Sequence, residues 1–213
     1  MKPRVLLADD HTLVLGGFVR LLEEHCQIVG LLADGRSLVD AAERLQPDIV
    51  ILDISMPLLN GIEACARIRR VSPETKVIVV TMHTAMAYAQ AALKSGASGY
   101  VLKRSATDEL LLAVQTVQLG EYYVTPLLTK DVVEVLVKDT SEMKAGLDDL
   151  SARQREILQL VAEGHTVKEI ASQLSLSPRT VEFHKGRAMQ QLNIHTTAEL
   201  VKYAIASGLI LPI

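Results

Sequence analysis

Five polar side chains follow short apolar runs in the first half of the chain, and their types suit phosphoryl chemistry. Asp9 and Asp10 end the run RVLLA, Asp53 lies in DIVILDI, Thr81 lies in KVIVVTM, and Lys103 follows SGYVL. Carboxylate oxygens are the ligands that Mg²⁺ prefers in proteins. A lysine supplies a positive charge for a phosphate oxygen, and a threonine hydroxyl can donate a hydrogen bond to it.

A parallel β-sheet would bring these side chains together. The apolar runs alternate with longer segments of helical spacing and occupy residues 4–8, 27–33, 48–54, 76–82 and 98–102. Strands that are apolar on both faces and are separated by helices are typical of an α/β doubly wound fold. We therefore predict a doubly wound, five-stranded parallel sheet, with the polar side chains at the edge formed by the carboxyl ends of its strands. Ser37 and Ser105 are predicted N-caps of two of its helices.

The expected acidic cluster needs a compensating positive charge. Three carboxylates within a few ångströms repel one another, and a divalent cation with oxygen ligands would offset that repulsion. Each residue also has a simpler interpretation, because an aspartate after a strand is often only the N-cap of the next helix. The presence of chemically complementary groups after four different strands favours the cluster.

The composition predicts a two-domain protein with reduced cysteines. The chain has 213 residues, 49% of them hydrophobic, which is enough for two domains with separate cores. A formal net charge of -3 argues against a polybasic mode of binding to nucleic acid or lipid. Cys26 and Cys65 lie in apolar segments and are expected to be buried thiols. No apolar run approaches the ~20 residues that span a bilayer, so we expect a cytoplasmic protein without membrane contact.

The C-terminal third has a different pattern, which divides the chain into residues 1–120, 121–148 and 149–213. The middle segment is polar and acidic, and we expect a partly helical linker there. In the last segment, which is helical throughout, Ser151, Thr166 and Ser177 are predicted N-caps. The second and third of its helices are joined by a tight turn, which predicts a helix-turn-helix arrangement in a smaller, all-α domain.

The third helix of this domain is the candidate DNA-binding element. The residues that we expect to contact DNA are Arg179, Thr180, Glu182, Phe183, Lys185, Gly186 and Arg187. Glu182 could accept a hydrogen bond from a cytosine amine or merely balance local charge. Gly186 would allow the backbone to approach DNA closely. Arg179, Lys185 and Arg187 are candidate phosphate or base contacts, although each could be an ordinary solvated charge.

The charge of this domain favours DNA only weakly. Residues 149–213 contain seven Lys or Arg against six Asp or Glu. Because phosphate contacts dominate affinity for DNA, we expect a monomer to bind weakly and a dimer to bind two half-sites.

Two sets of motifs resemble known families. Asp9-Asp10, the stretch DISMPLLNG that begins at Asp53, VVTM, and GYVLK with Tyr100 resemble the receiver domain of bacterial two-component response regulators over residues 1–120. The stretch LSARQREILQLVAEGHTVKEIASQLSLSPRTVEFHKGRAMQQL resembles the LuxR-type helix-turn-helix domain. In this order the two domains resemble the NarL/FixJ subgroup of response regulators.

The resemblance implies a phosphorylation-dependent transcription regulator that is not an enzyme. By that resemblance, Asp53 would accept a phosphoryl group from a sensor histidine kinase, and Lys103 would contact the group transferred. Mg²⁺ would be bound by Asp10, Asp53 and the backbone carbonyl of Ser55, with Asp9 acting largely through water. Thr81 and Tyr100 would form the switch. The phosphorylated protein would be a homodimer on a double-stranded DNA operator.

Three other functions are compatible with parts of the sequence. The receiver could be regulated by partner contact without phosphate, although the complete set of acceptor residues argues against this. A magnesium-dependent phosphatase needs a second aspartate two residues after its nucleophile, whereas His11 and Thr12 occupy those positions after Asp9 and Asp10. The C-terminal helices could instead bind protein. Taken alone, Tyr100 suits a strand with its hydroxyl outward, and His83 is expected to point to solvent.

Overall fold

The computed structural model describes residues 2–128, 150–207 and 209–210. The chain forms two compact units, Met1–Thr140 and Ser141–Ile213. The helical part of the predicted linker lies outside the described residues. In the described part of the chain, no helix combines the length and the apolar character needed to cross a membrane.

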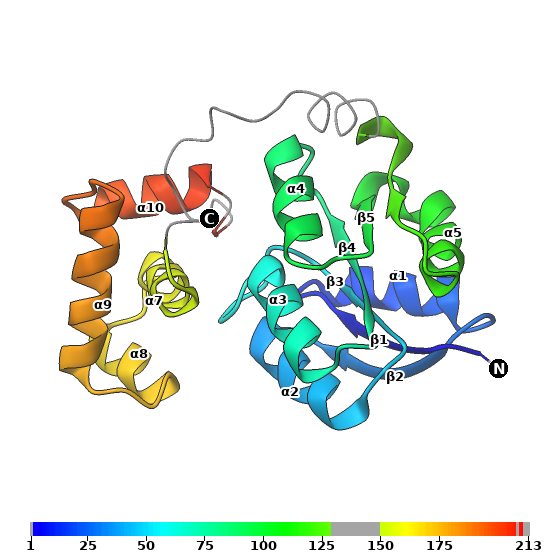
Figure 1. Cartoon of the computed structure of the whole chain (residues 1–213), viewed down its shortest axis with the longest axis horizontal. Coiled ribbons are helices and arrows are strands. Elements are labelled where there is room, and N and C mark those ends of the chain that lie inside the picture. Colours follow the sequence, from blue (N-terminus) through cyan, green and yellow to red (C-terminus); the bar gives the residue numbers. More distant parts are fainter. Residues whose placement is uncertain (1, 129–149, 208, 211–213) are drawn as a thin grey trace. The chain divides into compact units, whose positions relative to one another are not determined.

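The first unit is built on one parallel sheet with the strand order β2-β1-β3-β4-β5-β6 (Figure 1). Its strands are β1 (Arg4–Ala8), β2 (Gln27–Leu32), β3 (Ile49–Leu52), β4 (Lys76–Thr81), β5 (Gly99–Leu102) and β6 (Tyr123–Val124). The central strand β3 is buried along its whole length. This burial explains its unbroken apolar sequence, because helices cover both of its faces.

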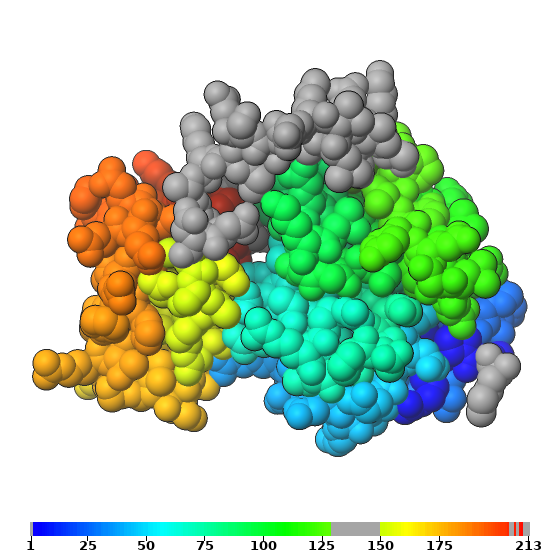
Figure 2. Space-filling model, in the orientation of Figure 1, coloured from blue at the N-terminus to red at the C-terminus, as the bar shows by residue number. Residues whose placement is uncertain are grey.

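Five helices cover the two faces of this sheet. They are α1 (Thr12–Leu22), α2 (Gly35–Leu45), α3 (Gly61–Val71), α4 (Met86–Lys94) and α5 (Ala106–Gln118). One core contains buried residues of α1 and α5, and the other contains buried residues of α2, α3 and α4. The helices α3 and α4 are in contact, and their atoms lie next to one another in Figure 2. The predicted doubly wound fold is confirmed.

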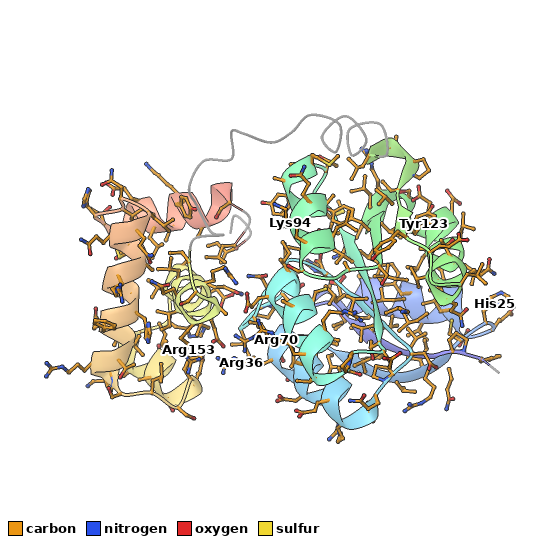
Figure 3. All side chains as sticks on the ribbon, viewed as in Figure 1. His25, Arg36, Arg70, Lys94, Tyr123 and Arg153 are labelled. Carbon is orange, nitrogen blue, oxygen red and sulfur yellow. The ribbon has the colours of Figure 1, made fainter. Side chains whose placement is uncertain are left out.

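The sheet has six strands, whereas the sequence analysis predicts five. The sixth, β6, lies in the range predicted to be linker and pairs in parallel with β5. Its backbone is held where Tyr123 N–H donates to Ser98 O at 3.0 Å. The Tyr123 hydroxyl, labelled in Figure 3, donates to Glu109 Oε2 at 3.2 Å. Burial and this carboxylate raise the pKa of Tyr123 to about 12. A strand of two residues has no periodicity, so the sequence did not reveal it.

Helix starts in the first unit differ in part from the prediction. The N-cap of α2 is Asp34, whose carboxylate accepts from the backbone N–H groups of Arg36 and Ser37. The prediction that Ser37 caps this helix is therefore wrong, because aspartate occupies the position three residues earlier. Ser105 is the N-cap of α5, but its side chain makes no capping hydrogen bond. Both cysteines are buried as expected, and burial raises the pKa of Cys65 to about 12.

In the described part of the second unit, the helices are α7 (Ala152–Ala162), α8 (Val167–Gln173), α9 (Pro178–Gln191) and α10 (Thr197–Ala206). Ser151, Thr166 and Ser177 cap the first three of these helices as predicted, and the first two form complete capping boxes. Arg153, labelled in Figure 3, ties α7 to the end of α8 by donating to Leu174 O at 2.9 Å. The helices α8 and α9 pack together and form the predicted helix-turn-helix pair.

Candidate functional site

The carboxyl edge of the sheet gathers the predicted acidic cluster. Asp9 and Asp53 are the first residues after β1 and β3, and the Asp53 N–H donates to Ala8 O at 3.0 Å. Potential ligand atoms of Asp9, Asp10, His11 and Asp53 all lie within 4.8 Å of one another. Asp9 and Asp53 are buried, whereas Asp10 faces solvent. The parallel topology therefore brings these carboxylates together as the sequence predicts.

Lys103 lies between the two buried carboxylates. It directly follows β5, and its Nζ is 2.7 Å from Asp9 Oδ2 and 2.7 Å from Asp53 Oδ2. Burial alone would lower the pKa of Lys103, but the charges and hydrogen bonds of Asp53 and Asp9 outweigh it and raise the pKa above its ordinary value. The ammonium therefore stays charged and offsets the repulsion between the two acids.

The two oxygens of Asp53 have different partners. Oδ1 accepts a hydrogen bond from the Ile54 N–H at 2.7 Å, and Oδ2 accepts one from Lys103 Nζ at 2.7 Å. These bonds fix the rotation of the carboxylate, so that Oδ2 is directed to the cationic side of the cluster. A carboxylate held in this way is a suitable acceptor for a phosphoryl group.

His11 is a member of the cluster that the sequence analysis missed. Its Nδ1 is 3.1 Å from Asp9 Oδ1 and 2.9 Å from Asp10 Oδ1. Its backbone N–H also donates to Asp9 Oδ1 at 2.9 Å. The position of His11 next to Asp10 was the available signal. The three carboxylates supply the hard oxygen ligands that Mg²⁺ prefers, so the side chains present fit this ion.

A second group of contacts lies beside Asp53. Ser55 Oγ and His83 Nε2 are 2.9 Å apart. The His83 ring stacks on Tyr88 with ring centroids 4.0 Å apart. Burial lowers the pKa of His83, the charge of Asp53 opposes this shift, and Lys103 adds to it. The prediction that His83 points to solvent is wrong, because its ring is held between Ser55 and Tyr88.

Thr81 and Tyr100, the predicted switch residues, are both fully buried. Thr81 is the last residue of β4, and its Oγ1 accepts from the His83 N–H at 3.3 Å. The Tyr100 hydroxyl donates to His83 O at 2.8 Å. Burial raises the pKa of Tyr100, and Tyr88 and Asp53 raise it further. The alternative of an outward hydroxyl is therefore wrong, and His83 links the two residues through its backbone.

The loop after Asp53 requires glycine at its end. A Cβ on Gly61 would lie 2.1 Å from the backbone oxygen of Asp53. The Gly61 N–H donates to Ile54 O at 2.7 Å, and α3 begins at this residue. The close approach of α3 to the loop after Asp53 thus depends on the absence of a side chain at residue 61.

The second unit presents one polar face of α9 to solvent. Val181 and Ala188 are buried against the unit's core, and they define the inner side of the helix. The exposed residues among those predicted to contact DNA are Arg179, Glu182, Phe183, Gly186 and Arg187. The arrangement of helices and this exposed face suit insertion of α9 into a major groove.

Two of the predicted contacts have partners within the unit. The hydroxyl of Thr180 is 2.8 Å from Ser177 Oγ, which places it in the helix cap. Lys185 is partly buried, and its Nζ is 3.8 Å from Glu182 Oε2. This distance favours a role of Glu182 in local charge balance. Nothing lies within 4 Å of a Cβ placed on Gly186, so the packing of the unit does not require glycine there.

Comparison with known families assigns both units. Residues 5–115 match the response regulator receiver domain. Residues 148–204 match the luxR family of bacterial regulatory proteins.

Individual relatives match along nearly the whole chain. The oxygen regulatory protein NreC of Staphylococcus epidermidis is 40% identical over 97% of this chain and 99% of its own. A structure of RcsB from Salmonella enterica serovar Typhimurium, bound to promoter P1flhDC in the presence of the phosphomimetic BeF3-, is 30% identical with a TM-score of 0.61. It covers 98% of this chain and 100% of that chain. A structure of two RcsB dimers bound to two parallel DNAs is 32% identical over 97% of this chain and 99% of that chain, with a TM-score of 0.58.

Proposed function

Because the chain belongs to the two-component response regulators of the NarL/FixJ subgroup, we propose that phosphorylation of Asp53 controls its binding to DNA. Such a protein is a DNA-binding transcription regulator. The observation that carries the phosphorylation proposal is the Asp53 carboxylate 2.7 Å from Lys103 Nζ, within a cluster that suits Mg²⁺. The complete acceptor set favours this function over control by partner contact alone.

The proposed transfer uses groups that are already in place. Asp53 Oδ2 attacks phosphorus as the bond to a histidine nitrogen of a sensor kinase breaks, and an acyl phosphate forms. Lys103 then contacts a phosphoryl oxygen. Asp10, Asp53 and the Ser55 backbone carbonyl would hold Mg²⁺ directly, and Asp9 would act largely through water. When bound, this ion would neutralise charge on the phosphoryl oxygens.

The proposed switch begins at Thr81. Its bond to the His83 N–H uses an oxygen lone pair, so the hydroxyl proton can be donated to a phosphoryl oxygen. Movement of Thr81 toward Asp53 would disturb the His83 backbone, which also accepts from Tyr100. A charge change at Asp53 would in this way bias the packing of Tyr100.

The output in this proposal is a homodimer on double-stranded DNA in the cytoplasm. Residues 1–120 together with β6 would form the receiver, residues 121–148 the connection, and residues 149–213 the DNA-binding domain. Arg179, Thr180, Glu182, Phe183, Lys185, Gly186 and Arg187 are the proposed contacts. The RcsB dimers bound to DNA support this mode of binding.

Phosphoryl acceptance is tested by Asp53→Asn in the full chain, with acetyl phosphate and Mg²⁺ as the donor mixture. We expect intact-mass measurement to show one added phosphoryl group on the wild type and none on D53N. Asp40→Asn, a change at an exposed carboxylate on α2, is the matched control and should be labelled like the wild type. A phosphoryl group retained by D53N would place the acceptor elsewhere.

DNA contact is tested separately by Arg179→Glu. We expect at least a tenfold loss of affinity for duplex DNA in a mobility-shift assay, because reversal replaces an attraction worth ~1–3 kcal/mol with a repulsion. Receiver labelling should not change. Lys202→Glu, at an exposed position on α10, is the control for net charge. Equal affinity of R179E and the wild type would exclude this face of α9 as the DNA contact.

A further inference from the structure

The DNA-contacting face of α9 carries an exposed aromatic ring, although the chain has only two phenylalanines. Phe18 is buried in the core of the first unit, whereas the Phe183 side chain is 59% exposed. An exposed phenylalanine forgoes the stabilisation that burial of its ring would give. The exposed side chains around it on this face include the charged residues Arg179, Glu182 and Arg187.

Folding of the second unit does not explain this ring. The inner side of α9 is formed by Val181 and Ala188, which are both fully buried. Phenylalanine is also a weaker helix former than alanine, so α9 gains nothing from Phe183 in local propensity. The Phe183 ring makes an edge contact with the neighbouring His184, with ring centroids 5.6 Å apart. The ring therefore contributes little to the unit's own packing.

Phe183 instead positions a neighbouring cation. The guanidinium carbon of Arg187, one helical turn further along α9, lies 5.8 Å from the centre of the Phe183 ring. A cation at this distance from a ring face is attracted by it, which restricts the rotamers of a long side chain. Gly186 has no side chain that could cover the pair. No other group covers this side of the helix there either, since nothing lies within 4 Å of a Cβ placed on Gly186. The ring and the guanidinium are therefore accessible from the solvent side of the helix.

The chemistry of this pair matches two groups in the major groove. Thymine is the base that presents a methyl group there, and a phenylalanine ring can pack against that methyl. Guanine presents O6 and N7, which arginine can contact through two hydrogen bonds. Four residues along a helix span about 6 Å. Successive bases in a strand are about 3.4 Å apart. The two bases must therefore lie within about two base pairs of one another.

We propose that Phe183 and Arg187 form a composite reader of base sequence, in which the ring contacts a thymine methyl and the guanidinium contacts a nearby guanine. This inference rests on the proposed binding of α9 to DNA. It goes beyond that proposal because it names the bases that are read and assigns the choice of thymine to Phe183. Arg187 is the guanine contact, and Phe183 both reads thymine and orients Arg187.

The experiment begins with selection of binding sites from random duplex DNA by the full-length chain, with acetyl phosphate and Mg²⁺ present. The wild type should enrich half-sites that contain thymine and guanine within two base pairs. Phe183→Ala should lose the thymine preference. Arg187→Lys, which keeps the charge but not the two parallel donors, should lose the guanine preference. Lys202→Ala is the matched control and should select the wild-type sequence.

The methyl group is then removed from the DNA alone. In the selected site, each thymine is replaced in turn by uracil. At one thymine per half-site this change should weaken wild-type binding about fourfold, which corresponds to ~0.8 kcal/mol for one buried methyl group. The same replacement should not change binding by F183A. Helical circular dichroism of F183A should match that of the wild type, since the ring is outside the core.

The outcomes separate this inference from the proposed function. If the wild type enriches a sequence but F183A selects the same sequence with the same sensitivity to uracil, Phe183 does not read thymine and the inference fails while DNA binding stands. If R187K keeps its guanine preference, Arg187 is not the guanine contact and the composite reader is wrong. If the wild type binds duplex DNA but enriches no sequence, this inference is wrong, and if it binds no duplex DNA in the mobility-shift assay, the proposed function is wrong as well.

Discussion

Lys103 is the residue that allows two carboxylates to share the interior of the sheet edge. Asp9 is 1% exposed and Asp53 is 4% exposed, so water does not solvate either carboxylate freely. Burial of an ionised carboxylate without a partner costs several kcal/mol. One ammonium at 2.7 Å from both acids supplies the compensation and leaves Asp53 oriented for transfer.

Tyr100 supports the first prediction at the scale of single residues. Tyr100→Phe removes the hydroxyl that donates to His83 O at 2.8 Å and leaves that carbonyl without this donor. We expect the free energy of unfolding of the first unit to fall by about 1 kcal/mol, which is typical of a lost hydrogen bond. Denaturant unfolding of the full chain, followed by spectroscopic signals of the first unit, measures the change.

Tyr122→Phe is the matched control for Y100F. The Tyr122 side chain is 74% exposed, and loss of its hydroxyl should change the stability by less than about 0.5 kcal/mol. Labelling of Asp53 in Y100F should stay close to that of the wild type, because the hydroxyl does not contact the acceptor. Equal stability of Y100F and Y122F would show that the buried hydroxyl bond contributes nothing.

The types of the acceptor residues could be predicted from the sequence, but their contacts could not. Asp9, Asp53, Thr81 and Lys103 end apolar runs, and parallel topology then requires a common edge. The bonds of His11 to the acids and of His83 to Ser55 depend on loop conformations that no periodic pattern encodes. The inward Tyr100 hydroxyl was missed for the same reason, since its partner is a backbone carbonyl.

At the scale of elements, the connection from β3 to α3 determines how closely a helix approaches the acceptor. Gly61 begins α3 directly against the backbone of Asp53, and Gly35 begins α2 against the backbone of Leu59. Backbone atoms cannot move aside as a flexible side chain can. A side chain at either glycine must therefore displace the loop.

Gly61→Ala should lower the free energy of unfolding by about 2 kcal/mol, within the usual range for overpacking of a filled site. The same change should slow labelling of Asp53 by acetyl phosphate, because the displaced loop carries the acceptor. Chemical denaturation and the rate of mass increase measure the two effects.

Gly17→Ala is the control for the chemical change. Gly17 lies within α1, and no atom lies within 4 Å of its Cβ position. Replacement of a helical glycine by alanine at an open position should stabilise the protein by about 0.5–1 kcal/mol. The free energy of unfolding is thus expected to fall in G61A and to rise in G17A. Stabilisation by both would show that the loop accommodates a methyl group at residue 61.

Elements were predictable wherever a pattern repeated. The run at residues 4–8 coincides with β1, and the other four predicted strands agree with the structure to within two residues at each end. The caps at Ser151, Thr166 and Ser177 were predictable because each precedes a clear helical pattern. The Ser37 prediction failed because Asp34 offers a stronger acceptor earlier in the turn. Neighbouring residues can each cap the same helix, and the spacing of residues in the sequence does not show which of them does so.

At the scale of the whole molecule, the chain joins a receiver domain to a LuxR-type helical domain whose helix α9 has one narrow exposed face. The exposed part of α9 offers few side chains, and residues 149–213 have an excess of only one basic residue over the acidic ones. A single copy can therefore neutralise few phosphates. Two copies on one operator would double the contacts and would require half-sites on the same side of the duplex.

This requirement gives a prediction for the DNA. Insertion of about five base pairs between the two half-sites turns one of them by half a helical turn, whereas about ten base pairs restore the alignment. In the presence of acetyl phosphate, the five-base-pair insertion should reduce affinity at least tenfold in a mobility-shift assay, and the ten-base-pair insertion should recover most of it.

The protein should bind DNA with a single half-site about as weakly as DNA with the five-base-pair insertion. The single half-site is therefore the reference for the affinity without cooperative binding. If the five-base-pair insertion had no effect, the copies would bind independently, and the dimer would have to be removed from the proposal.

In the proposed switch, the pairing of β6 with β5 would carry a movement of Tyr100 directly to the end of the sheet. Tyr100 is the register partner of Val124 in β6, and its carbonyl accepts from the N–H of Thr125, the residue directly after that strand, at 2.9 Å. A shift of the Tyr100 backbone would be transmitted to β6 without any intermediate element. The effect of phosphorylation would then depend on the stiffness of the short hydrogen-bonded ladder between β5 and β6. Variants that weaken this ladder would still accept the phosphoryl group and still bind DNA, but phosphorylation would no longer change the binding.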